Sequence, residues 1–446
     1  MSGMRRMAAA LAACALCSAA SAADELDSLF DLDKPLDAAG ATGGDASSAA
    51  GDGVRWSGYG EFRSAYTYAD PGHWSKLRAR AELTANGKLG ERTKFKLQGR
   101  LDVDPVFDLE RQYYPAAVRR DQRQEFSVRE AYLDTAAGDW EFRFGRQHVV
   151  WGEMVGLFLA DVVSARDLRD FFPTELETIR IPQWAARAEY FGGDAYFELL
   201  WIPVPSYDEI GRPGTDFYPF PLPAGTSVPE RKPRRAIDNG NWGVRATRLV
   251  AGWDLSAFFY RSLDVSPTLY RTSFAPTFEL RHDRIRQIGG TVSKDFGEFV
   301  LKGEAVHTRG RSFPTSDVAA EFGVTKSDTF DYVIGVDIPV QDVWRFYVQH
   351  FSRVTYDHEQ AMGSDRTESG LMLLVNRKLG DEFEAEVLMG SSFNREDYSI
   401  RPKLSWSITR DWRGQAGIDL FAGAKNGLFG RFDDRDRVYM EVRRWF

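Results

Sequence analysis

Apolar and polar side chains alternate along segments that repeat from about residue 54 to the end of the chain. In one such segment, Ile400 and Leu404 occupy one face, whereas Arg401 and Lys403 occupy the other. A period of two places successive side chains on opposite faces of a β-strand. One apolar face and one charged face are what a wall between lipid and water requires. The pattern therefore predicts a transmembrane β-barrel.

The connections between these segments alternate in length. Even-numbered segments end in tight turns, such as 192–193, and odd-numbered segments tend to end in longer polar connections, such as 203–239. Short periplasmic turns and long external loops are typical of bacterial outer-membrane barrels, and an even strand count leaves both termini in the periplasm. We therefore predict an all-β, closed, antiparallel barrel of about 18 strands over residues 54–446. The expected strands are 54–68, 73–86, 91–104, 124–136, 139–149, 181–191, 194–202, 240–250, 252–263, 276–294, 297–309, 328–338, 342–355, 366–379, 382–393, 397–409, 411–422 and 434–446.

A soluble sandwich or a lipocalin-like barrel would show the same alternation. Length argues against both, because an all-β domain usually stops at ~200–250 residues, whereas residues 54–446 carry the pattern throughout. Composition conceals the membrane character, since 27% of the residues are charged and the mean hydropathy is −0.39. A barrel can have such values because every second side chain faces its lumen.

The N-terminus predicts the compartment. Arg5 and Arg6 precede an apolar stretch and then small residues, which indicates a cleaved secretory signal peptide over residues 1–23. The two cysteines, Cys14 and Cys17, lie inside it, so the mature protein would have neither a disulfide nor a thiolate metal site. The residues up to Cys14 also resemble a lipoprotein processing site, and that reading stays open.

Residues 24–53 form a zone of their own. Asp, Ala, Gly and Ser dominate this zone, which is poor in aromatic residues. Such a segment cannot bury enough apolar surface to offset its ordering entropy, so we predict a disordered periplasmic leader. The apolar Leu26, Leu29 and Phe30 could form a helical turn against a partner or the barrel mouth, and an acidic tail that keeps the precursor soluble is the alternative.

The last strand resembles an assembly signal. Phe446 is the terminal residue, and Val438, Met440 and Val442 share its face. We therefore expect the chain to meet the barrel-assembly machinery and then outer-membrane lipid.

The polar faces of the strands predict a charged lumen. A barrel of about 18 strands encloses water unless something fills it. Basic residues of the early strands would form one wall and Glu384 and Glu386 an acidic one, so that solutes are screened by charge. Alternatively, these charges pair across strands and make the barrel rigid. The predicted lumen cations are Arg78, Arg80, Lys94, Lys96, Arg100, Arg143, Arg345, Arg401, Lys403 and Arg413.

The strand pattern is lost between residues 150 and 180, where residues 154–159 are apolar. An external loop of this kind would be poorly solvated, so we expect it to fold into the lumen, or over its mouth, as a constriction or plug. A structural cap is the alternative. Its charged side chains would need partners, such as Arg143 or the basic wall of the second and third strands.

The same region carries a family resemblance. The order Gly-Arg-Gln (145–147), Trp-Gly-Glu (151–153), an aspartate and Arg-Asp-Leu-Arg (166–169), ahead of a strand that begins Ile-Pro-Gln-Trp (181–184), resembles a Gram-negative outer-membrane barrel family known only as a domain of unknown function. The resemblance singles out Gln147, Trp151, Gly152, Glu153, Asp161, Arg166, Asp167 and Leu168. Gly-Arg-Gln alone is also similar to alginate-export and other substrate-selective porins.

That resemblance implies a function without a catalytic residue. Members are often encoded beside RND-type exporters and are thought to move lipidic or hydrophobic compounds. It implies a channel or exporter component with a periplasmic or RND-type partner. A plugged structural or interaction barrel that conducts nothing is the alternative.

Other function classes find little support. The six histidines are scattered, without metal-ligand spacing or a neighbouring nucleophile, so we expect neither an enzyme nor a cofactor. His148 lies near Glu153 and Asp161 and is the one histidine worth testing. The net charge of −8 and the absence of a phosphate-binding glycine loop argue against nucleic acid as a partner.

Overall fold

The computed structural model describes residues 53–154, 159–170, 176–233, 237–272 and 277–446. The predicted signal peptide (1–23) and almost all of the leader (24–53) lie outside the described residues, so both stay predictions.

Eighteen strands among the described residues form one closed antiparallel sheet, as predicted. Each strand pairs with its neighbours along the chain, and the last strand pairs with the first from Tyr59↔Trp445 to Thr67↔Arg437. The wall strands are β1 (Arg55–Thr67), β2 (His73–Lys88), β3 (Thr93–Val103), β4 (Gln124–Ala137), β5 (Trp140–Gln147), β8 (Gln183–Gly192), β9 (Ala195–Val204), β11 (Asn241–Val250), β12 (Trp253–Leu263), β15 (Arg284–Asp295), β16 (Val300–Pro314), β17 (Val324–Val340), β18 (Trp344–Thr355), β19 (Thr367–Leu379), β20 (Phe383–Ser392), β21 (Asp397–Thr409), β22 (Trp412–Ala422) and β23 (Arg437–Trp445).

The predicted strand 276–294 is wrong at its start. Wall strand β15 begins at Arg284, where the Asp264 N–H donates to the Asp283 C=O (2.7 Å) and ends the ladder with β12. The chain before it forms β14 (Phe278–Arg281), which pairs with β13 (Thr268–Arg271) and β10 (Glu230–Arg231) in a small separate sheet. Alternation continues through both β14 and β15, so the pattern alone does not show that the chain leaves the wall before Arg284.

Alternation separates the two faces of the wall. On β23, Val438 and Met440 are exposed on the outside, whereas Arg437, Glu441 and Arg443 are buried in the interior. A buried charge requires a partner, and the described lumen side chains form ion pairs between neighbouring strands, for example Arg401 with Asp419 (2.7 Å).

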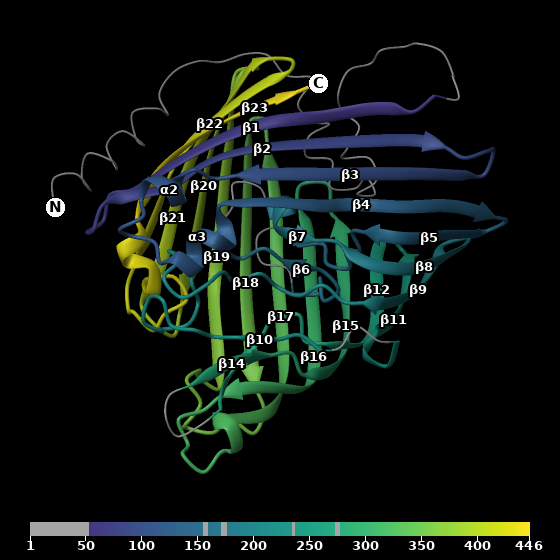
Figure 1. Ribbon diagram of the computed structural model, residues 1–446. Coiled ribbons are helices and arrows are strands. Elements are labelled where there is room, and N and C mark those ends of the chain that lie inside the picture. The colour runs from purple at the N-terminus through teal and green to yellow at the C-terminus, as the bar shows by residue number, and fades with distance from the viewer. Residues whose placement is uncertain (1–52, 155–158, 171–175, 234–236, 273–276) are drawn as a thin grey trace.

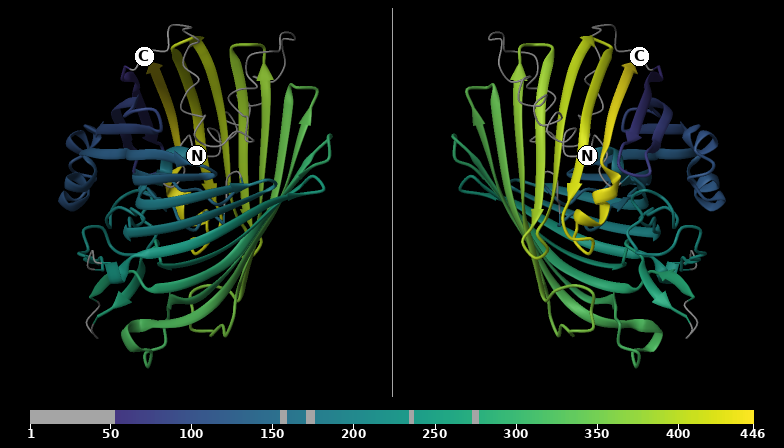
Figure 2. Two further views of the ribbon diagram at one scale, coloured as in Figure 1. Left: turned by 90° about the vertical axis from the view of Figure 1, so that its right-hand side faces the viewer. Right: turned by 90° about the vertical axis from the view of Figure 1, so that its left-hand side faces the viewer.

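Long connections gather at one end of the barrel and short turns at the other (Figure 1). The long ones contain α2 (Val106–Leu109), α3 (Ala116–Gln122), β6 (Ala165–Arg166), η2 (Leu176–Ile179), β7 (Arg180–Ile181), η3 (Ile237–Asn239), η4 (Glu321–Gly323) and η5 (Gly430–Arg435). No helix in the described ranges is long and apolar enough to cross a membrane. Early and late strands cross at a steep angle in both views of Figure 2, as strand tilt in a closed barrel produces.

The connection from β5 to β8 enters the barrel. We call residues 148–182 the strap. Figure 1 shows its short strands β6 and β7 between the wall of β1–β5 and the wall of β15–β19. The predicted inward-folding loop is therefore confirmed by its contacts with both walls, which are described below.

The first testable prediction concerns the seam. The N–H and C=O of Phe446 both bond to the backbone of Gly58 (3.0 Å each), so the terminal residue extends the closing ladder. Deletion of Phe446 should lower the amount of heat-modifiable barrel in the outer membrane. Phe393→Ala removes another exposed ring, in an external connection, and is the control. Equal barrel levels in the deletion and the control would contradict an assembly role for Phe446.

Candidate constriction site

The strap leaves the wall at a fixed point. Gly145 has a φ of +129°, and a Cβ there would lie 2.2 Å from the Ala131 carbonyl oxygen, so only glycine fits. Gln147 is fully buried, and its Nε2 donates to the Ala185 carbonyl (3.1 Å) on the next strand. The Gly-Arg-Gln sequence thus fixes the end of β5.

Trp151 anchors the strap to the inner wall. Its ring is fully buried and packs against Phe258 and Tyr260, with ring centroids 5.2 Å and 5.6 Å away. Its indole N–H donates to Glu198 Oε1 (3.1 Å), which satisfies the buried donor. A Cβ at Gly243 would lie 2.7 Å from the ring, so a glycine in β11 makes room for the tryptophan.

Glu304, on β16, holds the middle of the strap. Its Oε1 accepts the backbone N–H groups of Glu153 (2.6 Å) and Met154 (3.0 Å), and its Oε2 accepts those of Leu159 and Ala160 (2.7 Å each). A carboxylate offers about four acceptor sites, so each oxygen serves two strap amides.

Gly152 allows this close approach. A Cβ at this position would lie 2.8 Å from the Asp161 nitrogen and 3.0 Å from Glu304 Oε1. The glycine of the Trp-Gly-Glu sequence is therefore required mainly by the backbone of Asp161, and it also leaves room for the Glu304 carboxylate.

Glu153 and Met154 extend the contact around the wall. The Glu153 carboxylate accepts a hydrogen bond from Thr291 (3.0 Å) and lies 3.4 Å from an Arg245 nitrogen. Met154 packs against Val333 and Tyr347. The first half of the strap is thus bound to the inner faces of strands β9 to β18.

Asp161 is paired within the strap, which corrects the expectation of a partner on the wall. Its carboxylate accepts from Arg180 Nε (2.8 Å) and Ser164 (2.9 Å). The β6–β7 pairing brings these residues together, with Arg166 opposite Arg180. Arg143, the expected partner, instead binds Asp134 (2.6 Å) on the adjacent strand β4.

Residues Arg166 to Leu168 tie the strap to the connection between β9 and β11. The N–H of Arg166 donates to Asp208 Oδ1 and the N–H of Leu168 donates to the Glu209 carbonyl, both at 2.7 Å. Asp167 pairs with Arg169 (2.6 Å), which also lies 3.0 Å from Glu209. Burial raises the pKa of Glu209 to about 7, and the neighbouring Asp167 carboxylate acts in the same direction. The positive charge of Arg169 acts in the opposite direction but is outweighed.

Asp170 carries the strap to the opposite wall. It lies 2.7 Å from Arg437, 3.0 Å from Lys76 and 3.4 Å from Arg63, which belong to β23, β2 and β1. Burial acts to raise its pKa, but these three cations outweigh burial and hold the pKa well below the usual range. The strap therefore spans the lumen from one wall to the other.

A small polar opening remains beside Asp170. We call it the eyelet. Its volume of about 30 Å³ exceeds the ~10–15 Å³ that one water molecule needs, so it suits water rather than a larger solute. Both cations and carboxylates line it. The lining residues are Glu61, Arg63, Arg78, Arg80, Asp167, Asp170, Thr178, Ile179, Glu441 and Arg443.

The predicted lumen cations do not form a basic wall. Most of them lie within ion-pair distance of a carboxylate on an adjacent strand. These side chains therefore fit the alternative expectation, in which lumen charges pair across strands. The pairs are Arg78–Glu61 (2.6 Å), Arg80–Asp102 (2.7 Å), Lys96–Glu130 (2.5 Å), Arg100–Glu82 (2.8 Å), Arg143–Asp134 (2.6 Å), Arg345–Asp337, Arg401–Asp419 (2.7 Å) and Lys403–Glu386 (2.8 Å). Lys94 and Arg413 lie near the short-turn ends of β3 and β22.

The connection between β9 and β11 covers the mouth above the strap. Asp216 accepts from Tyr114 (2.7 Å) and lies 3.0 Å from His73 Nε2. Phe217 packs with Phe421 and Phe432 near the start of β23. Burial acts to raise the pKa of Asp216, but its hydrogen bonds from His73 and Tyr114 lower the pKa overall. This second layer was not expected from the sequence.

Sequence reasoning also missed Glu304, although a signal exists. Most lumen carboxylates face a cation on a paired strand, whereas Glu304 lies opposite Thr291 and Val333. A lumen carboxylate without a cross-strand cation must find its donors elsewhere.

His148 lies at the base of the strap, where burial and nearby arginines lower its pKa. The described ranges contain no cluster of three or more metal-ligating side chains.

Fold and strap together define a porin-like outer-membrane barrel, crossed inside by one connection. Residues 3–365 match DUF1302, described as a protein of unknown function, and the chain belongs to that family, as the resemblance implied. No curated protein matches the sequence.

Solved outer-membrane porins share the fold at low sequence identity. OccAB1 of Acinetobacter baumannii matches with a TM-score of 0.57 and 8% identity, over 90% of this chain and 99% of that one. OccAB4 of the same organism matches with a TM-score of 0.51 and 10% identity, over 88% and 98%. OccK2 of Pseudomonas aeruginosa, solved in complex with glucuronate, matches with a TM-score of 0.50 and 10% identity, over 88% and 98%.

The second prediction tests the Glu304 anchor. Glu304→Gln keeps the shape but replaces one of the two acceptor oxygens with an NH2 group, which faces two of the four strap N–H groups. Each buried donor left unsatisfied in this way costs about 1–3 kcal/mol. The strap should become sensitive to a protease added to the purified barrel, and single-channel conductance should rise. Gly152→Ala should act in the same direction by steric clash. Glu384→Gln, a buried lumen carboxylate bonded to Asn376, is the control. A strap as resistant as in the unmodified protein would contradict the anchor.

The third prediction concerns pH at the mouth. The pKa of Glu209 is about 7 in the fold against about 4.3 in an unfolded chain. The fold therefore favours the protonated form, and the stabilisation present below about pH 4.3 is lost as the pH rises through about 7. Protection of the Leu168 amide against hydrogen exchange, corrected for its intrinsic rate, should fall between about pH 5 and pH 8. Glu209→Gln should remove this dependence, and Glu91→Gln, in an exposed turn, should keep it. A pH profile unchanged by Glu209→Gln would refute the assignment.

Proposed function

We propose that the protein is a substrate-selective outer-membrane channel for small polar solutes, in which the strap sets the permeability. The observation that carries this proposal is the eyelet, the opening left where the strap meets β1, β2 and β23. Charges of both signs line it, and opposed charges in a narrow passage create a transverse field that orients dipolar solutes.

The chemistry of the eyelet favours polar over lipidic cargo. Ile179 is its one aliphatic lining residue among the described side chains, and the others are charged or hydroxylated. An apolar solute would have to displace water from these charges without replacing their hydration. The OccK2 barrel, which shares the fold, was solved with glucuronate, a small carboxylated sugar. A small polar solute with a negative group is therefore the substrate class to test first.

The volume of the eyelet favours a second candidate, the plugged barrel. An opening of about 30 Å³ passes no sugar unless side chains around it rearrange. A barrel closed in this manner would serve as a scaffold and would conduct nothing. Partnership with an RND-type exporter and export of hydrophobic compounds remain predictions of the family resemblance.

Conductance in planar bilayers separates the two functions. The channel should show small single-channel steps, and replacement of residues 150–180 by a short Gly-Ser linker should raise their size while the barrel stays heat-modifiable. A barrel that is silent with the strap, and conducts only without it, would support the plug and overturn the channel.

The fourth prediction concerns selectivity. Asp170→Asn removes the carboxylate that faces Arg437, Lys76 and Arg63, so the eyelet gains one net positive charge. The ratio of chloride to potassium permeability, measured from the reversal potential in a salt gradient, should rise. Asp134→Asn removes a carboxylate bound to Arg143, away from the eyelet, and should leave the ratio unchanged. An equal ratio in both variants would show that ions do not pass beside Asp170.

A further inference from the structure

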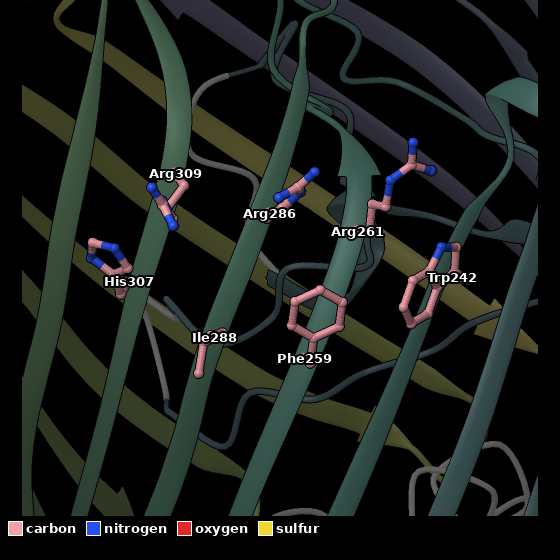
Figure 3. Close-up of a pocket in the computed structure, with 7 residues that line it drawn as sticks. All are labelled: Trp242, Phe259, Arg261, Arg286, Ile288, His307 and Arg309. Atoms are coloured by element: carbon pink, nitrogen blue, oxygen red, sulfur yellow. The ribbon is translucent and has the colours of Figure 1, made fainter.

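A groove of about 310 Å³ lies on the outer face of the barrel, over β11, β12, β15 and β16. Alternation places its lining on the lipid side, because the adjacent Phe258, Tyr260 and Val306 are buried against the strap. Its volume is within the range of small-ligand sites, about 300–1,000 Å³. Figure 3 shows the lining side chains, Trp242, Phe259, Arg261, Arg286, Ile288, His307 and Arg309.

Three arginines form a row across this groove. Arg261 pairs in register with Arg286, and Arg286 with Arg309, so three guanidinium groups lie side by side on adjacent strands (Figure 3). Arg261 and Arg286 are close to the strand ends that carry the long connections. Like charges directly opposite each other destabilise a sheet, so the row requires a counter-charge.

The described part of the chain supplies that counter-charge to only one member of the row. Arg309 Nε lies 3.4 Å from Asp328 Oδ2. Among the described residues, no carboxylate lies within ion-pair distance of Arg261 or Arg286, in contrast to the paired arginines of the lumen. Two cations on the lipid side therefore lack an anion from the described part of the chain.

Apolar surface continues from this row toward the middle of the barrel. The next row consists of Phe259, Ile288 and His307, and Ile288 is 58% exposed. Below it, Ala257, Gly290 and Ala305 lie side by side, so the row after the groove carries only small residues. Cations at the rim of the groove and apolar side chains below them match a molecule with an anionic head and an apolar tail.

We propose that this groove binds a phosphorylated lipid of the external leaflet, with its phosphate on Arg261 and Arg286 and an acyl chain along Phe259 and Ile288. Guanidinium groups bind phosphate through paired N–H donors, which makes arginine the suited residue for such a headgroup. The apolar part of the groove selects a lipid over free phosphate, because free phosphate would leave Trp242, Phe259 and Ile288 without an apolar partner.

The test uses the purified full-length barrel in an uncharged detergent. Native mass spectrometry would record adducts with diphosphoryl lipid A, with its dephosphorylated form and with inorganic phosphate. Diphosphoryl lipid A should bind, and Arg261→Gln/Arg286→Gln should weaken its binding at least about tenfold, because hydrogen bonds to charged groups contribute this much or more. Dephosphorylated lipid and inorganic phosphate should bind weakly to both.

Arg248→Gln/Arg444→Gln is the matched control, since both arginines lie on the outer face near the short-turn end. It should bind diphosphoryl lipid A like the unmodified barrel, and both double variants should stay heat-modifiable with unchanged conductance. Equal lipid binding by Arg261→Gln/Arg286→Gln and the unmodified barrel would overturn the proposal. Binding of inorganic phosphate as strong as that of the lipid would also overturn it, because it would indicate a site for free anions.

Discussion

The interior of this barrel depends on one carboxylate that binds four backbone amides. Glu304 accepts the N–H groups of Glu153 and Met154 with one oxygen and those of Leu159 and Ala160 with the other. Two stretches of the strap backbone therefore share a single side chain as acceptor. Backbone donors that enter a barrel cannot join its ladders and must be satisfied by side chains or water. A charged acceptor forms stronger hydrogen bonds than a neutral one, which suits backbone donors that no strand or helix satisfies.

The two halves of the strap are held by different interactions. The first half is apolar and hides Trp151 and Met154 against the wall, while the second half is charged and presents Asp170 to three cations. Burial of ions is costly unless each finds a partner, and Arg437 meets this condition by binding both Asp170 and Asp419 (2.7 Å each). The strap is thus part of the charge balance of the wall that it crosses, and neither is complete without the other.

Much of the fold could be predicted from the sequence, because a period of two and the alternation of loop lengths are local signals. The inward course of the strap followed from the same reasoning, since an apolar segment such as 154–159 needs shelter. Partners were harder to predict. Asp161 finds Arg180 through the short β6–β7 pairing, and Asp170 finds Arg437 across 267 positions of sequence. Neither ion pair can be predicted from the spacing of residues along the chain, because both depend on where the strap lies once the barrel is closed.

Cation pairing also suggests how a crossed barrel could still conduct. Detaching the Glu304 half would break four hydrogen bonds to a charged group, each worth about 1.5–3 kcal/mol, so this half should stay in place. At the eyelet, by contrast, Arg78 already lies near both Glu61 (2.6 Å) and Asp102 (3.6 Å). Arg443 likewise lies near Glu61 (2.8 Å) and Glu441 (3.3 Å). When such an arginine moves from one carboxylate to the other, it is paired before and after the move. The free-energy cost is therefore lower than that of separating an ion pair. Under the proposed channel function, exchange of partners by Arg78 and Arg443 is the motion that would widen the eyelet while the strap stays fixed.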